Sequence, residues 1–297
     1  MRKTKMKIIL VSIICVSCVS ISMGNGRGTT SGLTLTMSPD VRGEAMGSAQ
    51  TGVAKGARAI HWNAAGLAGL KKGKEVNLMY SKWIEDINRQ AVLGAYALKR
   101  GTLGFGIHRI SMGEITKTED LTGAEKGTYN PNDTIVMVGY AEKLKYADVG
   151  ITAKYLRSEI ESVAQTLTFD IGAKRKFLEK KLSVGIALQN IIGNLKYHEE
   201  KTDLPRIYKA GCGYKVRKNV LVTMDIGNES ERGLVWGIGG EYKHKRGKQT
   251  YSVRAGYNNI SEDISSGIRI GLGMEMKQIS VDYAYVPLSV EEFGDSH

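Results

Sequence analysis

From residue 75 to residue 287 the chain repeats a unit of roughly ten residues in which every second side chain is apolar. A turn rich in Gly, Asn or Lys closes each unit. In residues 268–276, for example, Ile, Leu and Met alternate with Arg, Gly and Glu. A period of two is that of a β-strand, whose successive side chains point to opposite faces of a sheet. One face of each predicted strand is therefore apolar and the other polar, so the two faces cannot contact the same solvent.

Thirteen segments follow this pattern, and their number is odd. They cover residues 75–80, 89–98, 102–110, 134–143, 148–157, 166–177, 182–190, 207–216, 220–226, 234–242, 251–257, 268–276 and 279–286. Single-chain bacterial barrels close with an even number of strands. If these segments form a barrel, one strand is missing or miscounted.

The length of the segments separates a membrane barrel from a soluble β-sandwich, which also alternates. The apolar windows run roughly nine to eleven residues, the length that a tilted strand needs to cross a hydrocarbon core, whereas soluble strands average about five to six. Aromatic residues near the window ends could form interfacial girdles, although they also enter strands for ordinary β-propensity. They are Tyr80, Trp83, Tyr155, Tyr214, Tyr242, Tyr257 and Tyr285. Length and girdles together predict an all-β fold, an antiparallel transmembrane β-barrel.

Residues 1–24 have the pattern of an export signal. Four basic residues among the first seven precede an apolar run over residues 8–19, and small residues at Ser20, Ser22 and Gly24 offer a cleavage site. The run is too short to span a membrane as a helix, and no later stretch approaches the roughly 20 apolar residues that a membrane helix requires. The sequence therefore predicts an exported protein that crosses the outer membrane many times with strands.

The composition fits closely packed strands and leaves the role of the surface charge open. Glycine is abundant, with 36 residues, and proline is scarce, with 4, as expected where the ladder needs nearly every N–H. The formal net charge is +12, and basic residues cluster in turns such as 71–74 and 243–246. Two interpretations remain: solvated turns, or contacts with anionic head groups of outer-membrane lipid. Nucleic acid is a poor alternative for an exported chain without a binding motif.

Residues 38–70 differ from the repeats that follow. Gly and Ala are frequent over 42–56, and residues 57–70 place Ile60, Ala64, Leu67 and Leu70 near helical spacing. We expect a short helical plug inside the barrel; a periplasmic helix packed under the rim is the alternative. The predicted organisation is a signal peptide over 1–24, a lead and plug or hatch segment over 25–74, and a barrel over 75–297.

A family resemblance rests on this segment and on the carboxyl end. Residues 59–68 read AIHWNAAGLA, in which Trp62, Asn63, Ala65, Gly66 and Leu67 match an aromatic-Asn-Pro-Ala-Gly-Leu core, with Ala64 in place of the usual Pro. This motif resembles the amino-terminal signature of the PorV/PorQ group of FadL-like outer-membrane barrels. Residues 282–287 and 293–297 resemble the penultimate strand of that group and the turn that follows.

The resemblance implies a barrel of fourteen strands and two kinds of role. The chain would then be a truncated or incompletely predicted product that lacks its final strand, or an alternative strand closes it. PorV-like members serve protein secretion, and the main prediction is a non-enzymatic barrel of the PorV/PorQ type in transport or secretion. FadL-like members pass hydrophobic molecules, and this channel role is the alternative, so the implied partners are secretion-system proteins or a hydrophobic ligand.

The polar faces of the predicted strands carry charge repeatedly, as a wet lumen would. The lumen-facing residues are predicted to include Lys154, Asp170, Lys174, Asp225, Glu241, Arg254, Arg269, Glu275 and Asp282. They favour interstrand salt bridges that fill a narrow interior over a fatty-acid site.

The plug motif gives a hypothesis for the hatch. Asn63 would supply side-chain hydrogen bonds at a turn, Gly66 would allow a backbone conformation or close approach that other residues resist, and Trp62 would wedge against the wall, with Leu67 completing the motif. A segment that simply fills the lumen for stability is the competing explanation.

An enzyme is a competing class, and the sequence offers little for it. Five histidines are present, but no Gly-x-Ser-x-Gly elbow, HExxH helix or Cys/His metal spacing accompanies them. The sequence therefore predicts no catalytic residue, no metal and no cofactor. A structural or adhesive surface barrel remains a third class.

Overall fold

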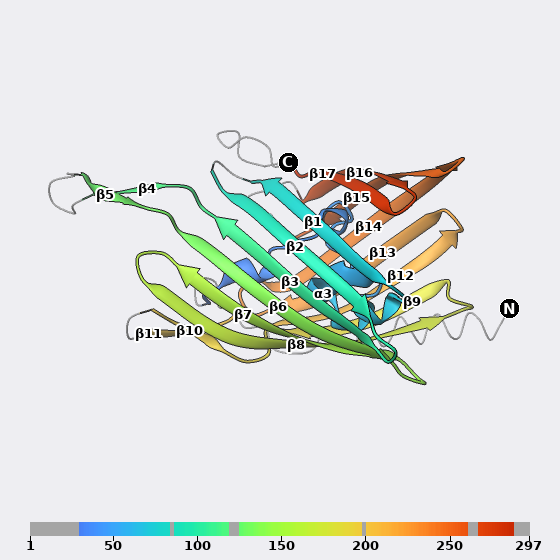
Figure 1. The fold of residues 1–297 in the computed structure, drawn as a ribbon, viewed down its shortest axis with the longest axis horizontal. Helices are drawn as coiled ribbons and strands as arrows, with labels where there is room; N and C mark the ends of the chain where they lie inside the picture. Colours follow the sequence, from blue (N-terminus) through green and yellow to red (C-terminus); the bar gives the residue numbers. More distant parts are fainter. Residues whose placement is uncertain (1–29, 84–85, 119–124, 198–199, 261–266, 288–297) are drawn as a thin grey trace.

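The computed structural model describes residues 30–83, 86–118, 125–197, 200–260 and 267–287. Within them, thirteen strands form one antiparallel sheet in the order of the sequence (Figure 1). These strands are β1 Lys74–Lys82, β2 Asn88–Ala97, β3 Thr102–Ser111, β6 Asn132–Lys143, β7 Asp148–Glu159, β8 Val163–Phe177, β9 Leu182–Gln189, β12 Ile207–Arg217, β13 Val220–Glu229, β14 Gly233–Arg246, β15 Gln249–Asn258, β16 Ile268–Met276 and β17 Ile279–Tyr285. Each of the thirteen predicted segments is confirmed as a strand of this sheet.

The connections at the two ends of the sheet differ in length. At one end the strands are joined by short turns, while two of the connections at the other end contain a hairpin each (Figure 1). One hairpin pairs β4 Ile115–Thr118 with β5 Glu125–Tyr129, and the other pairs β10 Asn194–Tyr197 with β11 Glu200–Asp203. Bacterial barrels keep their short turns in the periplasm and their long loops outside. We call the two ends the short-turn end and the long-loop end.

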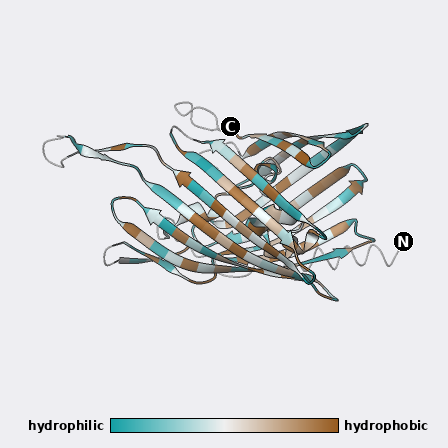
Figure 2. Cartoon of the chain, in the orientation of Figure 1, coloured by the Kyte–Doolittle hydropathy of each residue, from teal (hydrophilic) through white to brown (hydrophobic). Residues whose placement is uncertain are grey.

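The outer face of the sheet is apolar, and alternate residues are buried inside. Leu78, Val138 and Leu272 are 76%, 58% and 58% exposed, whereas the inward Met137 is only 1% exposed. Hydrophobic and hydrophilic residues alternate along the strands (Figure 2). An apolar face of this extent suits lipid, because soluble monomers rarely expose large contiguous apolar patches. No helix in the described part of the chain has the length and apolarity to cross a membrane.

The strands at the two edges of the sheet are β1 and β17. In the described ranges, β1 pairs with β2 and β17 pairs with β16. The two edge strands run in the same direction, because an odd number of antiparallel strands makes up the sheet. A fourteenth strand running opposite to both could pair with each, but that strand stays a prediction. Residues 288–297 and the predicted signal peptide lie outside the described residues.

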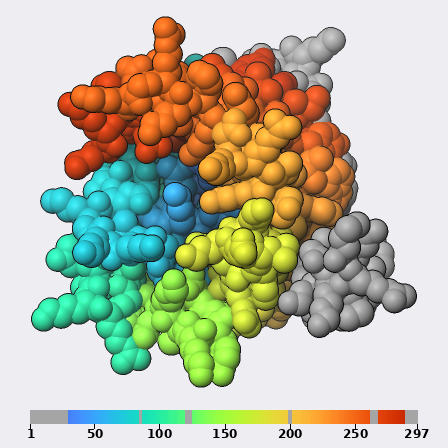
Figure 3. All heavy atoms as spheres, turned by 90° about the vertical axis from the view of Figure 1, so that its right-hand side faces the viewer, coloured from blue at the N-terminus to red at the C-terminus, as the bar shows by residue number. Residues whose placement is uncertain are grey.

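Residues 33–70, which we call the plug, lie within the curved sheet. Figure 3 looks onto the short-turn end and shows the plug in blue between strands of other colours. Its elements are η2 Leu33–Thr36, α2 Val41–Glu44, η3 Gly56–Arg58, α3 Ala59–Trp62 and η4 Ala64–Gly69. The predicted position inside the barrel is thus observed, but the helix is shorter than the spacing over 57–70 predicts. It breaks at Asn63, whose backbone is extended at φ −164° and whose side chain caps the next turn.

Candidate functional site

The interface between the plug and the lumen wall is the candidate functional site, and Trp62 lies at its centre. The indole is buried, and its Nε1 donates a hydrogen bond of 2.9 Å to a carboxylate oxygen of Asp40. The other oxygen of Asp40 accepts a bond of 3.3 Å from Arg58. Asp40 precedes α2 and Trp62 ends α3, so this contact ties the two halves of the plug together.

Asn63 joins the plug to the wall through backbone groups. Its Nδ2 donates to the carbonyl oxygens of Thr51 at 2.9 Å, Ala173 at 3.3 Å and Ile186 at 3.2 Å. Its Oδ1 accepts from the N–H of Ala65 at 3.1 Å, which caps η4. Since Ala173 lies on β8 and Ile186 on β9, one amide side chain bridges the plug and two strands.

Gly66 and Leu67 allow close contact on two sides of η4. A Cβ at Gly66 would collide with the carbonyl oxygen of Ala54, so only glycine fits between these plug segments. Leu67 is fully buried, and its methyl groups lie against the backbone of Gly104 on β3 and Gly139 on β6. Side chains at these wall positions would displace Leu67.

Glycines of the strands form the surface that receives the plug backbone. A Cβ at Gly172 or Gly185 would collide with the Asn63 amide, and one at Gly150 with the backbone of Ala64. At Gly239 a Cβ would collide in the same way with Met46. These four strand glycines therefore mark where the plug touches the wall.

A chain of ion pairs connects the plug to β14, β15 and β17. Arg42 forms two bonds of 2.9 Å with Glu241, and Arg254 bonds the same carboxylate at 2.8 Å. Arg254 also pairs with Asp282 at 2.7 Å, and Asp282 lies 3.8 Å from Arg58. These five residues, Arg42, Arg58, Glu241, Arg254 and Asp282, we call the plug latch. Both ends of the latch are plug arginines, so the wall carboxylates hold the plug at two points.

A second contact group lies on β7 and β8. Lys154 pairs with Asp170 at 2.6 Å across the two strands and donates to Asn190 at 3.2 Å. Lys174 donates to the carbonyl oxygen of Ala54 at 2.5 Å and so reaches the plug. All these charged side chains are buried, so each depends on its partner for stability.

Two further carboxylates hold plug segments. Asp225 on β13 accepts hydrogen bonds from the backbone N–H groups of Gln50 at 2.9 Å and Thr51 at 2.8 Å. Glu44 of the plug lies 3.6 Å from Arg269 on β16 and 4.0 Å from Arg89 on β2. Glu275, by contrast, lies near the end of β16 and is exposed.

An apolar cluster occupies the opposite part of the lumen. It includes the inward residues Leu93 of β2, Ile110 of β3, and Ile135 and Met137 of β6. Sequence reasoning did not single these residues out. A signal exists in residues 135–138, which are apolar at four consecutive positions and thus indicate a strand that is apolar on both faces.

The cluster continues into the long-loop end and into the plug. Leu195 of β10 and Leu204 pack with Leu35 of η2, and a Cβ at Gly32 would collide with Leu156. The plug contributes Ile60 and Leu67 to the same cluster. His108 of β3 is 1% exposed, and its Nε2 has no hydrogen-bond partner among the described residues.

His61 of the plug is also buried, and its chemistry is that of a neutral side chain. Burial lowers the pKa of His61 well below its ordinary value, and the nearby Lys154 adds to this effect. The ring contacts Trp62 edge-on with centroids 4.9 Å apart. In the described ranges, no group of three or more His, Cys, Asp or Glu residues is placed to hold a metal ion.

The fold and the plugged lumen define a class of protein, a plugged antiparallel β-barrel. The sequence matches no protein family and no curated protein. Its fold is similar to that of the Pseudomonas putida toluene transporter TodX, with 10% identity, a TM-score of 0.58, and coverage of 86% of this chain and 93% of that chain.

Two other solved barrels are similar to the same extent. The Ralstonia pickettii toluene transporter TbuX has 14% identity and a TM-score of 0.56, and covers 88% of this chain and 95% of its own. The CymD monoaromatic hydrocarbon channel has 11% identity and a TM-score of 0.56, with coverage of 89% and 96%. At these identities the likeness establishes the predicted FadL-like barrel fold. It is not specific to the PorV/PorQ group.

Proposed function

We propose that this protein is a non-enzymatic outer-membrane channel for small hydrophobic molecules, in which the plug controls passage. The apolar cluster carries this proposal, because it joins the long-loop end to the plug along β2, β3 and β6. Binding sites for small molecules are mostly apolar with a few polar groups. Three barrels of similar fold are described as toluene transporters or a monoaromatic hydrocarbon channel, which supports the same class of cargo.

The contacts of the plug indicate how a ligand would pass. Ile60 and Leu67 meet the apolar wall through contacts that a hydrophobic molecule can replace without leaving a charge unpaired. The ion pairs of the plug latch lie on the other side of the lumen and would keep the plug attached. His108 at the apolar wall, whose Nε2 lacks a partner among the described residues, would favour a ligand that carries a polar substituent.

A PorV/PorQ-type role in secretion is the second candidate, because the motif around Asn63 resembles the signature of that group. Asn63 and Gly66 hold the plug in place by the contacts described above, but such contacts serve a channel and a secretion barrel alike. The fold neighbours support the channel more than the secretion role.

Uptake of radiolabelled toluene by bacteria that produce the protein tests the proposal. We expect faster uptake than in cells with an empty vector, and a loss of at least half of the gain in Ile135→Asn, which places an amide in the apolar wall. Leu144→Asn is the matched control, because Leu144 is exposed in the turn after β6. Uptake equal to that of empty-vector cells, with the barrel confirmed by heat-modifiable migration, would contradict the channel role.

A further inference from the structure

Basic residues are concentrated at the short-turn end of the barrel. The turn after β2 carries exposed Lys99 and Arg100, of which Arg100 pairs with Glu142 at 2.6 Å, and exposed Lys143 and Lys145 lie at the end of β6 and in the turn after it. The turns after β8 and β12 carry Lys180, Lys181, Arg217 and Lys218. In the part of the chain that the structure describes, the exposed carboxylates at this end are Glu179 and Glu275. This end therefore presents a ring of positive charge.

The long-loop end carries charges of both signs, and these pair with each other. Lys117 lies 3.1 Å from Glu161, and Arg157 lies 3.0 Å from Glu159. The excess of positive charge is thus a property of one rim. In an outer membrane with short turns in the periplasm, that rim lies at the leaflet whose lipids face the periplasm.

Aromatic residues fix the height of the basic rim relative to the lipid. Lys145 lies over the ring of Tyr146 at 5.3 Å, and Arg175 lies over Phe177 at 5.1 Å. Tyrosine and tryptophan are enriched at the boundary between hydrocarbon and head groups. Cations that contact them are placed at the level of lipid phosphates.

One concave site lies on this rim, between the β14–β15 and β16–β17 hairpins. It is an open hollow with a volume of about 480 Å³, and it is lined by Arg246, Lys248, Gln249, Tyr251, Met276 and Lys277, together with Gly247. Gln249 and Met276 are paired in register on β15 and β16, so the two hairpins form one surface. We call this site the rim niche.

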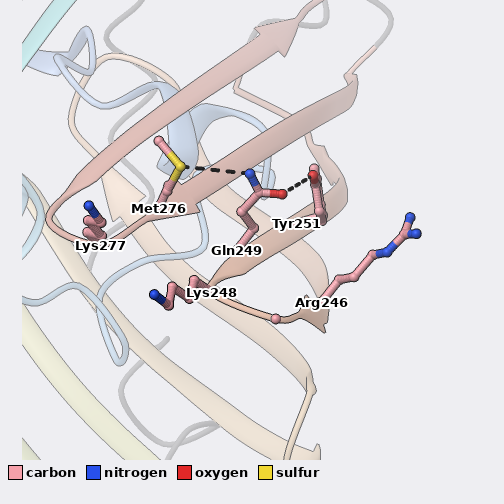
Figure 4. Close-up of a pocket in the computed structure, with 7 residues that line it drawn as sticks. Arg246, Lys248, Gln249, Tyr251, Met276 and Lys277 are labelled. Atoms are coloured by element: carbon pink, nitrogen blue, oxygen red, sulfur yellow. Dashed lines mark hydrogen bonds between the residues drawn. The ribbon is translucent and has the colours of Figure 1, made fainter.

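The side chains of the rim niche are arranged with apolar groups beside cations. Figure 4 shows Gln249 between Met276 and Tyr251, with Lys248 and Lys277 on the side of Met276 and Arg246 extending away on the other side. The Gln249 amide accepts a 2.6 Å hydrogen bond from Tyr251 and donates toward the Met276 sulfur at 3.7 Å.

The rim niche opens on the lipid-facing side of the wall. Tyr251 and Met276 lie on the same faces of their strands as the outward Val253 and Leu272, because side chains alternate with a period of two. Val253 and Leu272 are register partners that extend the apolar surface away from the niche toward the membrane centre. A molecule with a charged head and an apolar tail matches this order of polar and apolar groups.

We propose that the rim niche binds the head group of an anionic glycerophospholipid. Its phosphate would lie between Lys248 and Lys277, with Arg246 at the far edge of the niche and the acyl chains along Val253 and Leu272. This inference does not depend on the channel role, because the niche faces lipid and the plug faces the lumen. The proposal gives a role to some of the basic residues, which the composition alone does not explain.

Lipid retention in native mass spectrometry tests the proposal on the purified full chain in mixed phosphatidylglycerol and phosphatidylcholine. We expect retention of phosphatidylglycerol in preference to phosphatidylcholine. A basic residue beside an anionic head group contributes about a fivefold gain in binding per charge, and this attraction falls off within about 10 Å, so basic residues elsewhere on the rim add little to it. The variant Arg246→Gln/Lys248→Gln/Lys277→Gln should therefore reduce phosphatidylglycerol retention at least tenfold.

The matched control removes three charges from the same rim outside the niche, in Lys176→Gln/Lys180→Gln/Lys181→Gln on the β8–β9 hairpin. Its retention should stay within about twofold of the wild type. Equal losses in the two variants would overturn the proposal in favour of general rim charge, as would a lack of preference in the wild type. Soluble glycerol phosphate should not displace the lipid at millimolar concentration; displacement would indicate a site for free phosphate.

Heat-modifiable migration establishes folding of each variant before the lipid measurement. Lys248→Gln alone is a milder variant for the same measurement, and we expect a loss of about fivefold. Unchanged retention in a folded Lys248→Gln protein would contradict a contact between this lysine and the phosphate.

Discussion

The two sides of the lumen hold the plug by different physical means. Apolar inward residues of β2, β3 and β6 form a wall that packs against Ile60 and Leu67. The inward residues of β14, β15 and β17 form a charged wall that binds Arg42 and Arg58 through ion pairs. Apolar contacts are not directional and tolerate exchange of one partner for another, whereas a buried ion pair is costly to break. We infer that the charged wall anchors the plug, and that the plug can move away more easily from the apolar wall.

Two segments of the plug, α2 and η4, lie against different strands of the sheet. Residues 40–44 contact the charged wall, and α2 lies against β16 and β17. Residues of η4 contact β6 and β7. A ligand in the apolar wall would therefore compete with η4 and leave α2 in place.

Removing the centre of the plug latch should have the largest effect. In Glu241→Gln, Arg42 and Arg254 lose a shared buried carboxylate, and we expect the free energy of unfolding to fall by about 3–5 kcal/mol. Urea titration of the refolded barrel, followed by heat-modifiable migration, measures this change. The control Glu275→Gln alters an exposed carboxylate and should change stability by less than about 0.5 kcal/mol. Equal effects in the two variants would show that the charged wall does not anchor the plug.

Truncating the apolar wall should cost less. Leu93 is 1% exposed, and Leu93→Ala leaves a cavity in the cluster, so we expect a loss of about 3 kcal/mol in the free energy of unfolding. The same variant should bind a small aromatic hydrocarbon more tightly, because the cavity lies in the wall proposed to contact ligand. Isothermal titration with toluene measures the binding. A Leu93→Ala protein with the same free energy of unfolding as the wild type, or as the exposed-turn control Leu144→Ala, would be evidence against a packed apolar wall.

The smallest effect is expected where the two kinds of contact meet. Asn63 bonds carbonyl groups of Thr51, β8 and β9 and caps Ala65, and Asn63→Ala removes all of these bonds. We expect a loss of about 2 kcal/mol, because each buried hydrogen bond contributes about 0.5–1.5 kcal/mol. The exposed Asn130→Ala serves as the control in the same titration. A change below the experimental error for Asn63→Ala would mean that the motif does not hold the plug.

The strand pattern was readable from the sequence because a strand that separates two environments must alternate at every residue. All thirteen strands of the sheet follow segments identified in that way. The hairpins β4–β5 and β10–β11 do not follow from that pattern, since their short strands lack the full apolar window. The plug helix was overestimated, because a spacing of apolar residues does not reveal that Asn63 caps a new turn.

The candidate site was only partly readable in the same way. The charges on the inward faces of β14 and β15 follow directly from the period of two, and so does the placement of Lys154 and Asp170 on facing strands. The partners within the plug do not follow, because Arg42 and Glu241 are separated by 199 residues along the chain. The same holds for the strand glycines. The sequence indicates that they are packing residues, but it does not show that they form the surface that receives Met46, Ala64 and Asn63.

The sequence by itself determined the strands, the faces that they turn to lipid and to the lumen, and the presence of a separate plug segment, because each depends on local periodicity. Only the tertiary structure decided that the lumen has an apolar wall and a charged wall, and that Arg42 and Arg58 meet Glu241 and Asp282. The physical reason is that pairing across the lumen depends on the curvature and register of the whole sheet. These bring together residues far apart in sequence, and no local pattern encodes that proximity.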